Sequence, residues 1–327
     1  MNEFAKYLAR RSSIAVATVY GVISSNFFIF RLLPGNSIEI MYRGAELTQS
    51  QIDALSTQFG LDKPLWWQYF IYIWNTLQGS LGISYYFREP VGDVIFPAIV
   101  NSLILLAPGV TLAIIMGILT GKAAAWRRGK KGDYAILGVS MGLWAIPAYW
   151  LGALVIMVAV YVGGMPVSGM HTLGITFTSP AYEVEDLLRH LLLPLVTFTL
   201  VVYGHYTLIM RNSLINVLSE DYILFAKAKG ADDQTILDRH ALPNAMLPMV
   251  STIAISIGTL VTGALLVETV FTWPGIGWLL YDCIVARDYP LMQGTFLILA
   301  VSVVLANFIA DLVYGCLDPR IRYMREV

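Results

Sequence analysis

The chain has 327 residues, of which 57% are hydrophobic and only 13% are charged, and its formal net charge is −1. Soluble domains carry about 25% charged residues, so this composition and a mean hydropathy of +0.66 exclude a soluble protein and indicate a lipid membrane as partner. A net charge this close to zero gives no reason to expect binding to nucleic acid.

Six segments predict membrane spans, because a helix needs about 20 residues to cross a hydrocarbon core of roughly 30 Å. Backbone polar groups must be paired inside lipid, so each span must be helical. The sequence therefore predicts an all-α membrane protein. The predicted spans are 12–33, 100–121, 134–162, 190–210, 246–267 and 289–311.

The first predicted span follows Lys6, Arg10 and Arg11, as the apolar region of a signal peptide would. It is too long for such a region and does not end in a small-x-small cleavage pattern. We therefore interpret it as a retained first span.

The segment from Trp66 to Tyr86 is free of charge but rich in Gln, Asn, Thr, Gly and Ser. This polarity argues against a seventh span, and its Trp and Tyr residues are typical of an aromatic belt at the membrane interface. Before it, Thr48-Gln-Ser-Gln51 has the pattern of a capping box that opens a short helix. We expect region 36–99 to be folded and extracytoplasmic.

The positions of Lys and Arg predict the orientation, because these residues gather in cytoplasmic loops. Fifteen of the 21 lie in the N-terminus, the loops after the second and fourth spans, and the C-terminus. Both termini are therefore predicted to be cytoplasmic, which agrees with an even number of spans.

The loop after the fourth span predicts two helices joined by a hinge. Helix formers run to Lys229, and Gly230 then stands where a left-handed C′ glycine ends a helix. Ala231, Asp232 and Asp233 can begin a second helix, with carboxylates at its positive end. Pro243 is expected to end that second helix.

This loop resembles the "EAA" loop of ABC-importer permeases, in the branch that imports oligopeptides, dipeptides and nickel. The matching spacing is Ala226-x-Ala228-Lys229-Gly230, nine residues, then His240-Ala-Leu242-Pro243. The family's glutamate position holds Leu224, and its two alanine positions hold Phe225 and Ala226. Further fragments in family order are Gly60-Leu-Asp62-Lys-Pro64, Gly79-Ser-Leu-Gly82, Ile146-Pro147-Ala-Tyr-Trp150, Glu268-Thr-Val-Phe271-Thr-Trp273-Pro274-Gly275 and Arg287-Asp288-Tyr289-Pro290.

The resemblance implies a type I ABC importer permease fold with six transmembrane helices and both termini cytoplasmic. It divides the chain into an N-terminal helix (1–35), an extracytoplasmic region (36–99), a five-helix core (100–315) with coupling loop 211–245, and a tail (316–327). The residues it assigns to ATPase coupling are Ala226, Ala228, Lys229, Gly230, Ala231, Asp232, Asp233, Leu242 and Pro243.

The implied partners are a second homologous permease, two ATP-binding cassette ATPase subunits and an extracytoplasmic substrate-binding protein. The chain has no Gly-x-x-x-x-Gly-Lys-Ser/Thr phosphate loop. We therefore expect no cofactor and no enzymatic activity in this chain, with ATP and Mg²⁺ bound by the partner ATPases.

Three residues are candidates for the pore or a gate: His205 in the fourth span, and Glu268 and Trp273 after the fifth. An ionisable group deep in a span is a functional candidate, but a neutral histidine bonded between helices explains His205 equally well. For Glu268 the alternative is capping at the interface. The scattered histidines and cysteines predict no metal site.

Two other classes of protein compete with the importer. An ion-gradient-driven secondary transporter commonly has acidic residues near mid-membrane, and none lies near a predicted span centre. A membrane enzyme would need a polar triad or metal cluster at one depth, which the sequence lacks. The sequence leaves the cargo open among oligopeptides, oligosaccharides and nickel.

Overall fold

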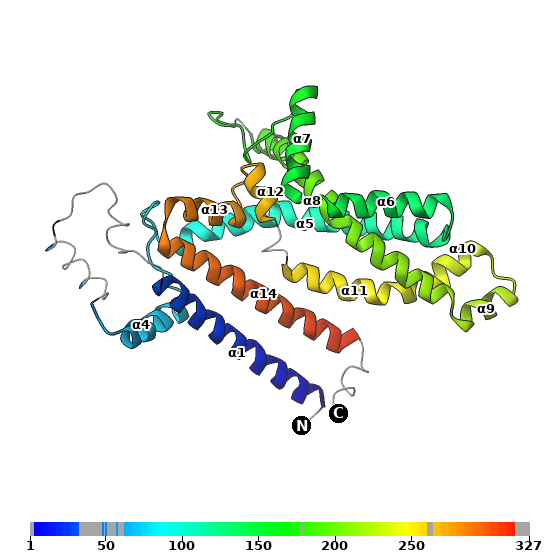
Figure 1. Ribbon diagram of the computed structural model, residues 1–327, viewed down its shortest axis with the longest axis horizontal. Coiled ribbons are helices and arrows are strands. Elements are labelled where there is room, and N and C mark those ends of the chain that lie inside the picture. The colour runs from blue at the N-terminus through cyan, green and yellow to red at the C-terminus, as the bar shows by residue number, and fades with distance from the viewer. Residues whose placement is uncertain are drawn as a thin grey trace. The chain divides into compact units, whose positions relative to one another are not determined.

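The computed structural model (Figure 1) describes residues 3–32, 62–177, 179–259 and 264–317, together with Thr48, Ser50 and Thr57. Regular structure in these residues is helical apart from one bridge between Ile83 and Pro90, so the all-α prediction is confirmed for them. The helices are α1 (Glu3–Arg31), α4 (Leu65–Leu77), α5 (Val91–Trp126), α6 (Lys131–Ala145), α7 (Ala148–Val162), α8 (Pro180–Leu218), α9 (Asp221–Ala228), α10 (Asp233–Thr235), the π-helix η1 (Ile236–Ala241), α11 (Leu242–Thr259), α12 (Leu265–Val270), α13 (Ile276–Ala286) and α14 (Tyr289–Leu317).

Four predicted spans correspond to helices that are long and apolar enough to cross a bilayer. These are Tyr7–Arg31, Val91–Trp126, Pro180–Leu218 and Tyr289–Ile309. The fifth predicted span, 246–267, is covered by α11 up to Thr259, and residues 260–263 lie outside the described part of the chain. That span stays a prediction, as do the capping box at 48–51 and the tail at 318–327, for the same reason.

The third predicted span, 134–162, differs from expectation because it consists of two helices. α6 and α7 are bent by 101° at the break between them. Ile146 and Pro147 have extended backbones, with ψ of 127° and 134°. Proline has no N–H to donate and disfavours the helical conformation of the residue before it, so the helix stops at Ala145 and restarts after Pro147.

The described chain divides into two compact units, residues 1–101 with 275–327 (unit 1) and residues 102–274 (unit 2). Helix α5 contributes its first residues to unit 1 and the rest to unit 2. This division differs from the one predicted at residues 35, 99 and 315, which follows membrane topology and stays a prediction.

In unit 1, α1 and α14 pack along one another in opposite directions (Figure 1). Near the start of α1, Tyr7 Oη donates to the carbonyl of Asp311 at 2.8 Å, and Arg11 is 2.7 Å from the Asp311 carboxylate. Near its end, Asn26 Nδ2 donates to the carbonyl of Gln293 at 3.0 Å. The first turns of α1 therefore meet the last turns of α14.

Helix α4 lies against α1 through hydroxyl groups: Ser24 is hydrogen-bonded to Tyr69 at 2.7 Å, and Asn26 donates to Tyr72 at 3.0 Å. Its Trp66, Phe70 and Trp74 side chains are exposed. At about 1.5 Å per residue, 13 residues span roughly 20 Å, which is too short for a bilayer core. The structure agrees with an interfacial helix in place of a seventh span.

In unit 2, glycines bring α8 close to two neighbouring helices. A Cβ on Gly117 of α5 would lie 2.3 Å from Tyr206 Cβ, and a Cβ on Gly204 of α8 would lie 2.2 Å from the carbonyl oxygen of Ser140 in α6. Small residues allow such close packing of helices in membranes, where van der Waals contact drives association.

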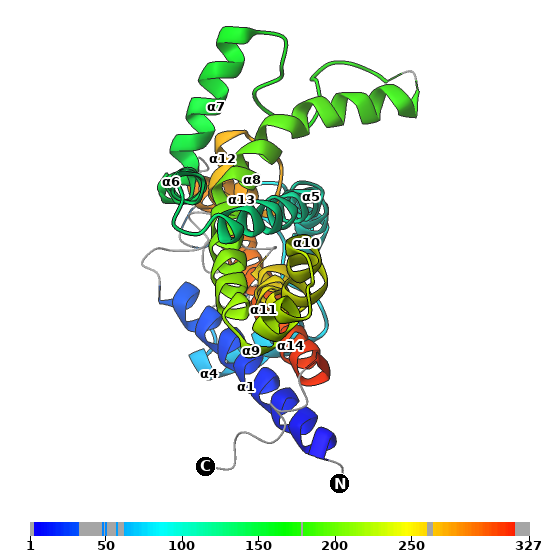
Figure 2. The ribbon, with the colours of Figure 1, turned by 90° about the vertical axis from the view of Figure 1, so that its right-hand side faces the viewer.

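The loop after α7 is fastened inside unit 2, at the end where α7 and the first turns of α8 are found (Figure 2). Gly169 N donates to the carbonyl of Phe271 at 2.8 Å, and the Asp186 carboxylate accepts from Thr172 N at 2.9 Å. His190 is buried, and its Nδ1 lies 2.9 Å from the carbonyl of Asp186.

Candidate coupling site

Helix α9 ends in a complete Schellman motif at Gly230. Gly230 has φ of +85°, its N–H donates to the carbonyl of Lys227 at 2.9 Å, and Ala231 N donates to the carbonyl of Ala226 at 3.2 Å. Only glycine, and to a lesser degree asparagine, adopts this left-handed conformation readily. The predicted left-handed glycine at the end of this helix is confirmed, and its role as a hinge stays a prediction.

Asp232 begins the next helix as its N-cap. Its carboxylate accepts a hydrogen bond from Thr235 N at 2.7 Å. The hydrogen bonds from Thr235 lower the pKa of the exposed Asp232 carboxyl group, as expected when the charged form is the one that is bonded. Asp233 is exposed in the first turn of α10, where its charge faces the positive end of the helix.

The expectation that Pro243 ends the second helix is wrong. α10 continues as η1 and then directly as α11, whose second residue is Pro243. The N–H of Leu242 donates to the carbonyl of Leu237, five residues back. In an α-helix the proline ring would meet the carbonyl four residues earlier. The wider π turn avoids that contact, so the chain remains helical through the proline.

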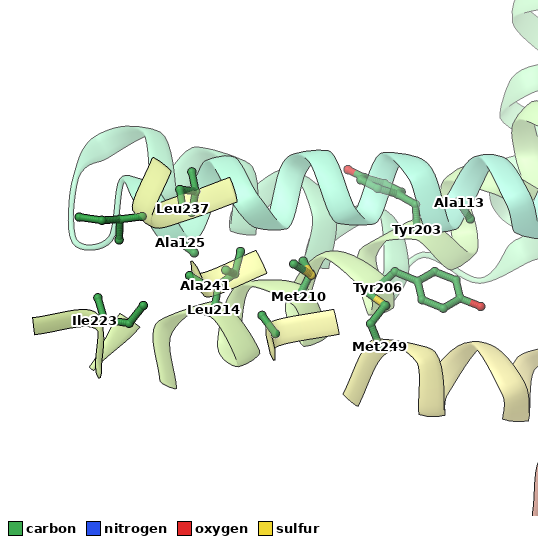
Figure 3. Packing of buried hydrophobic residues seen from close by; sticks show 12 residues of the cluster. Ala113, Ala125, Tyr203, Tyr206, Met210, Leu214, Ile223, Leu237, Ala241 and Met249 are labelled. Carbon is green, nitrogen blue, oxygen red and sulfur yellow. The ribbon is translucent and has the colours of Figure 1, made fainter. Parts of the chain in front are cut away.

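We refer to residues 221–241 as the coupling segment, and its apolar side packs into unit 2. Ile223, Ile236, Leu237 and Ala241 are buried in a cluster that also contains Met210 and Leu214 of α8 (Figure 3). Figure 3 shows Leu237 and Ala241 at the same end of the cluster as Leu214, with Ala125 of α5 beside them. The segment is therefore held in a fixed orientation by its core contacts.

The opposite side of α9 exposes two large apolar residues. Leu224 is 68% and Phe225 is 62% exposed, and the Lys229 ammonium lies 4.5 Å above the Phe225 ring. We call Leu224 and Phe225 the apolar knob. Exposed apolar residues beside charged ones are typical of a protein contact surface.

Hydrogen bonds tie α9 to the start of α11. The Tyr222 hydroxyl accepts from Asn244 Nδ2 at 2.9 Å and donates to the carbonyl of His240 at 3.3 Å. Asn244 Nδ2 also donates to the His240 carbonyl at 2.9 Å. These bonds bridge the turn at Gly230, so α9 is joined to the start of α11.

Two ion pairs connect this region with other helices. Lys122 of α5 donates to the Asp238 carboxylate of η1. Arg211 of α8 makes two hydrogen bonds of 2.7 Å to the Asp133 carboxylate of α6. Asp133 is only 1% exposed and also accepts from Gly129 N at 3.0 Å, so this second pair is largely shielded from water.

The structure brings the predicted coupling residues together around the turn at Gly230 and the start of α11. Ala226, Ala228, Lys229, Gly230 and Ala231 form the end of α9 and its turn. Asp232 and Asp233 start α10, and Leu242 and Pro243 start α11. No comparison or measurement tests their contact with an ATPase, so that role stays a prediction.

Sequence reasoning missed the apolar knob, Tyr222, and the partners Lys122 and Asp238. The knob had a visible signal, because Leu224 and Phe225 are large apolar residues at the positions where the resembled family has a glutamate and an alanine. The ion pair had none, since its residues are 116 positions apart in sequence.

The candidate gate residues lie apart from the coupling segment. Glu268 and Trp273 are 1% and 0% exposed, and Ser102 Oγ donates to Glu268 Oε1 at 2.7 Å. His205 is partly buried, with its ring centroid 6.0 Å from that of Trp144. In this conformation Glu268 and Trp273 face the interior of unit 2, and a role for any of the three in a pore stays a prediction.

No group of three or more His, Cys, Asp or Glu residues suited to a metal ion is found among the residues that the structure describes. The geometry instead defines a class: an integral membrane protein with several helices that are long and apolar enough to cross a bilayer, and with a helical turn that exposes Leu224 and Phe225.

Comparison with known proteins places the chain within that class. Residues 109–323 match the family model "Binding-protein-dependent transport system inner membrane component", and residues 4–99 match the N-terminal model of the same kind of component. The chain belongs to the family of inner-membrane permease components of binding-protein-dependent transport systems, the permeases of ABC importers.

Named relatives are similar to this chain over nearly its whole length. The di/tripeptide transport system permease protein DppB of Pseudomonas aeruginosa is 36% identical, covering 98% of this chain and 99% of the relative. The dipeptide permease DppB of Escherichia coli is 34% identical with the same coverage. The oligopeptide permease AppB of Bacillus subtilis is 33% identical, covering 98% of this chain and 100% of the relative.

Proposed function

We propose that this chain forms half of the translocation pore of an ATP-driven peptide importer. The observation that carries the proposal is the full-length similarity to permeases named for di/tripeptides, dipeptides and oligopeptides. Such similarity covers the membrane helices and the coupling loop together. The cargo is therefore expected to be short peptides, ahead of the oligosaccharides or nickel that the sequence left open.

The proposed topology has six spans with both termini in the cytoplasm. The distribution of Lys and Arg supports it, with 15 of 21 on the proposed cytoplasmic side. The packing of α1 against α14 supports it independently. Tyr7 and Arg11 near the start of α1 contact Asp311 near the end of α14, so the two termini are expected on one face of the membrane.

The proposed energy source is a pair of separate ATPase subunits, which bind ATP and Mg²⁺. The apolar knob and the neighbouring charges of Lys229, Asp232 and Asp233 provide the surface for one of them. An exposed apolar centre within a polar rim is the usual anatomy of such an interface. The buried side of the coupling segment transmits the contact to α8 and α11.

The remaining proposed partners are a second, homologous permease that completes the pore and an extracytoplasmic protein that delivers the peptide. The family description supports the delivery protein, because it names transport that depends on a binding protein. Region 36–99 is the proposed part of its docking surface on this chain.

Reconstitution of the complete transporter in proteoliposomes tests the proposal. A labelled tripeptide should accumulate only when ATP is supplied on the side of the membrane that carries the ATPase subunits. All subunits and the binding protein must also be present. Unlabelled di- and tripeptides should compete with it, whereas an oligosaccharide or Ni²⁺ should not. Uptake by this chain alone, driven by an ion gradient, would overturn the proposal in favour of a secondary transporter.

A further inference from the structure

The Asp238 carboxylate has a different environment from those of its acidic neighbours. Asp232 and Asp233 are exposed at the start of α10. Asp238 belongs to η1, between the turn at Gly230 and α11, and accepts a hydrogen bond from Lys122 Nζ of α5. This bond joins the C-terminal part of the coupling segment to a helix that is distant in sequence.

Helix α5, which contributes Lys122 to this contact, is long and has residues in both compact units. It has 36 residues, or about 54 Å at 1.5 Å per residue. Residues 91–101 belong to unit 1, and the helix from Ser102 onward belongs to unit 2. A displacement applied near Lys122 therefore acts on one long, continuous helix.

The apolar packing around η1 has a different mechanical character. Leu237 of η1 and Ala125 of α5 lie in the same buried cluster. Hydrophobic contact is non-directional, so it resists separation from the core but allows sliding along the helix. A charge-assisted hydrogen bond has a preferred direction and length. The Lys122–Asp238 pair therefore fixes the register of η1 on α5.

We propose that the Lys122–Asp238 ion pair is the contact through which a movement of the coupling segment is passed to α5. Both residues are positioning residues, which act without contacting nucleotide or peptide. This inference rests on the proposed ATPase-driven function. The same movement reaches α11 through the continuous backbone of η1. The ion pair therefore couples the movement of α5 to that of α11.

The pair adds little to folding stability, which makes its role testable. The side chains of Lys122 and Asp238 are 29% and 37% exposed, and ion pairs accessible to solvent contribute about 0–1 kcal/mol to stability. The isosteric change Asp238→Asn should therefore leave folding, membrane insertion and ATPase binding intact. Only the transfer of motion should be impaired.

The experiment compares peptide transported per ATP hydrolysed by the reconstituted transporter, with ATPase retention measured in parallel. Asp238→Asn and Lys122→Gln should each lower this ratio by up to about fivefold, since a solvent-accessible ion pair contributes at most about 1 kcal/mol and can pass on no more coupling free energy than that. ATPase retention should be unchanged. The double variant Lys122→Gln/Asp238→Asn should be no worse than either single variant, because both remove one contact.

The charge-exchange variant Lys122→Asp/Asp238→Lys should recover part of the ratio lost in Asp238→Lys alone. The matched control is Glu185→Gln, which breaks an exposed pair with Arg189 on α8. It should leave the ratio unchanged.

A normal ratio in Asp238→Asn, or a double variant that shows the sum of two separate losses, overturns the inference. Failure of the proposed function gives a different result. In that case neither the unaltered chain nor the Asp238 variants would retain ATPases or transport peptide with ATP.

Discussion

Ala231 and Ala226 are joined by a hydrogen bond of 3.2 Å that crosses the turn at Gly230. This bond sets the direction in which α9 leaves the coupling segment and thus the orientation of the apolar knob. Its geometry depends on the positive φ of Gly230. Four predictions concern this elbow and the helices that support it.

Gly230→Val should abolish ATPase binding while leaving membrane insertion intact. A left-handed conformation costs a residue with a side chain about 1–2 kcal/mol, and more for a β-branched one. The turn at Gly230 should therefore open, and the apolar knob should point away from the ATPase. The measurement is the amount of ATPase that copurifies with the chain.

Gly230→Asn is the matched control, because asparagine tolerates the left-handed conformation and also ends helices in this way. It should retain most of the ATPase. If Gly230→Val captured as much ATPase as the unaltered chain, the turn would have no part in docking.

Replacing the knob by Leu224→Ser and Phe225→Ser should weaken ATPase binding by more than about tenfold. Residues at the centre of an interface contribute about 2 kcal/mol or more each, and 1.4 kcal/mol corresponds to a factor of ten. The folded chain should be unaffected, since both side chains are exposed. Titration of ATPase onto the nanodisc-embedded chain measures the Kd.

Leu173→Ser provides the control for this titration, because Leu173 is 95% exposed but lies in the loop after α7. Its Kd should equal that of the unaltered chain. Equal weakening by Leu173→Ser and Phe225→Ser would point to a general effect of surface apolarity in place of a specific contact.

Asp133→Asn should destabilise the folded chain by about 3 kcal/mol, because it leaves the Arg211 charge in a shielded site without its anionic partner. The Asp133 and Arg211 side chains are only 1% and 17% exposed. The melting temperature in detergent should fall accordingly. The double change Asp133→Leu with Arg211→Met should lower the melting temperature less than Asp133→Asn does. An equal or larger decrease in the double variant would contradict the burial argument.

Gly117→Ala should lower the melting temperature, because the new Cβ would lie 2.3 Å from Tyr206 Cβ and 3.0 Å from Thr207 N. Helices α5 and α8 must then move apart, and overpacking of this kind costs about 1–3 kcal/mol. Gly138→Ala is the same substitution in α6 with nothing within 4 Å of the new Cβ. It should leave the melting temperature unchanged or raise it, since alanine favours helix over glycine. A similar fall in both variants would exclude a packing effect.

Local chemistry explains why several features could be predicted from sequence. The turn at Gly230 follows from the backbone freedom of one residue, and the N-cap at Asp232 from a side chain that reaches its own helix. The long helices follow from apolar runs of bilayer length. In each case the interacting groups are within a few residues of each other.

Other features depended on contacts between distant residues. The bend of 101° between α6 and α7 has a local trigger in Pro147, but Pro194 lies inside α8 without stopping that helix. The continuous helix from η1 into α11, which contains Pro243, likewise contradicted the rule that proline ends a helix. Whether a proline bends, breaks or is accommodated is decided by the packing around it.

The sequence by itself determined that this is a membrane protein and which family it resembles. It also determined that one helix ends and another begins at the turn around Gly230. These properties come from the free energy of transfer of side chains and from local backbone preference. Only the tertiary structure decided that Asp238 meets Lys122, that Asp133 meets Arg211, and that Leu224 and Phe225 face outward. Such pairings arise when helices pack, because packing alone fixes which sides of distant segments lie within hydrogen-bonding distance.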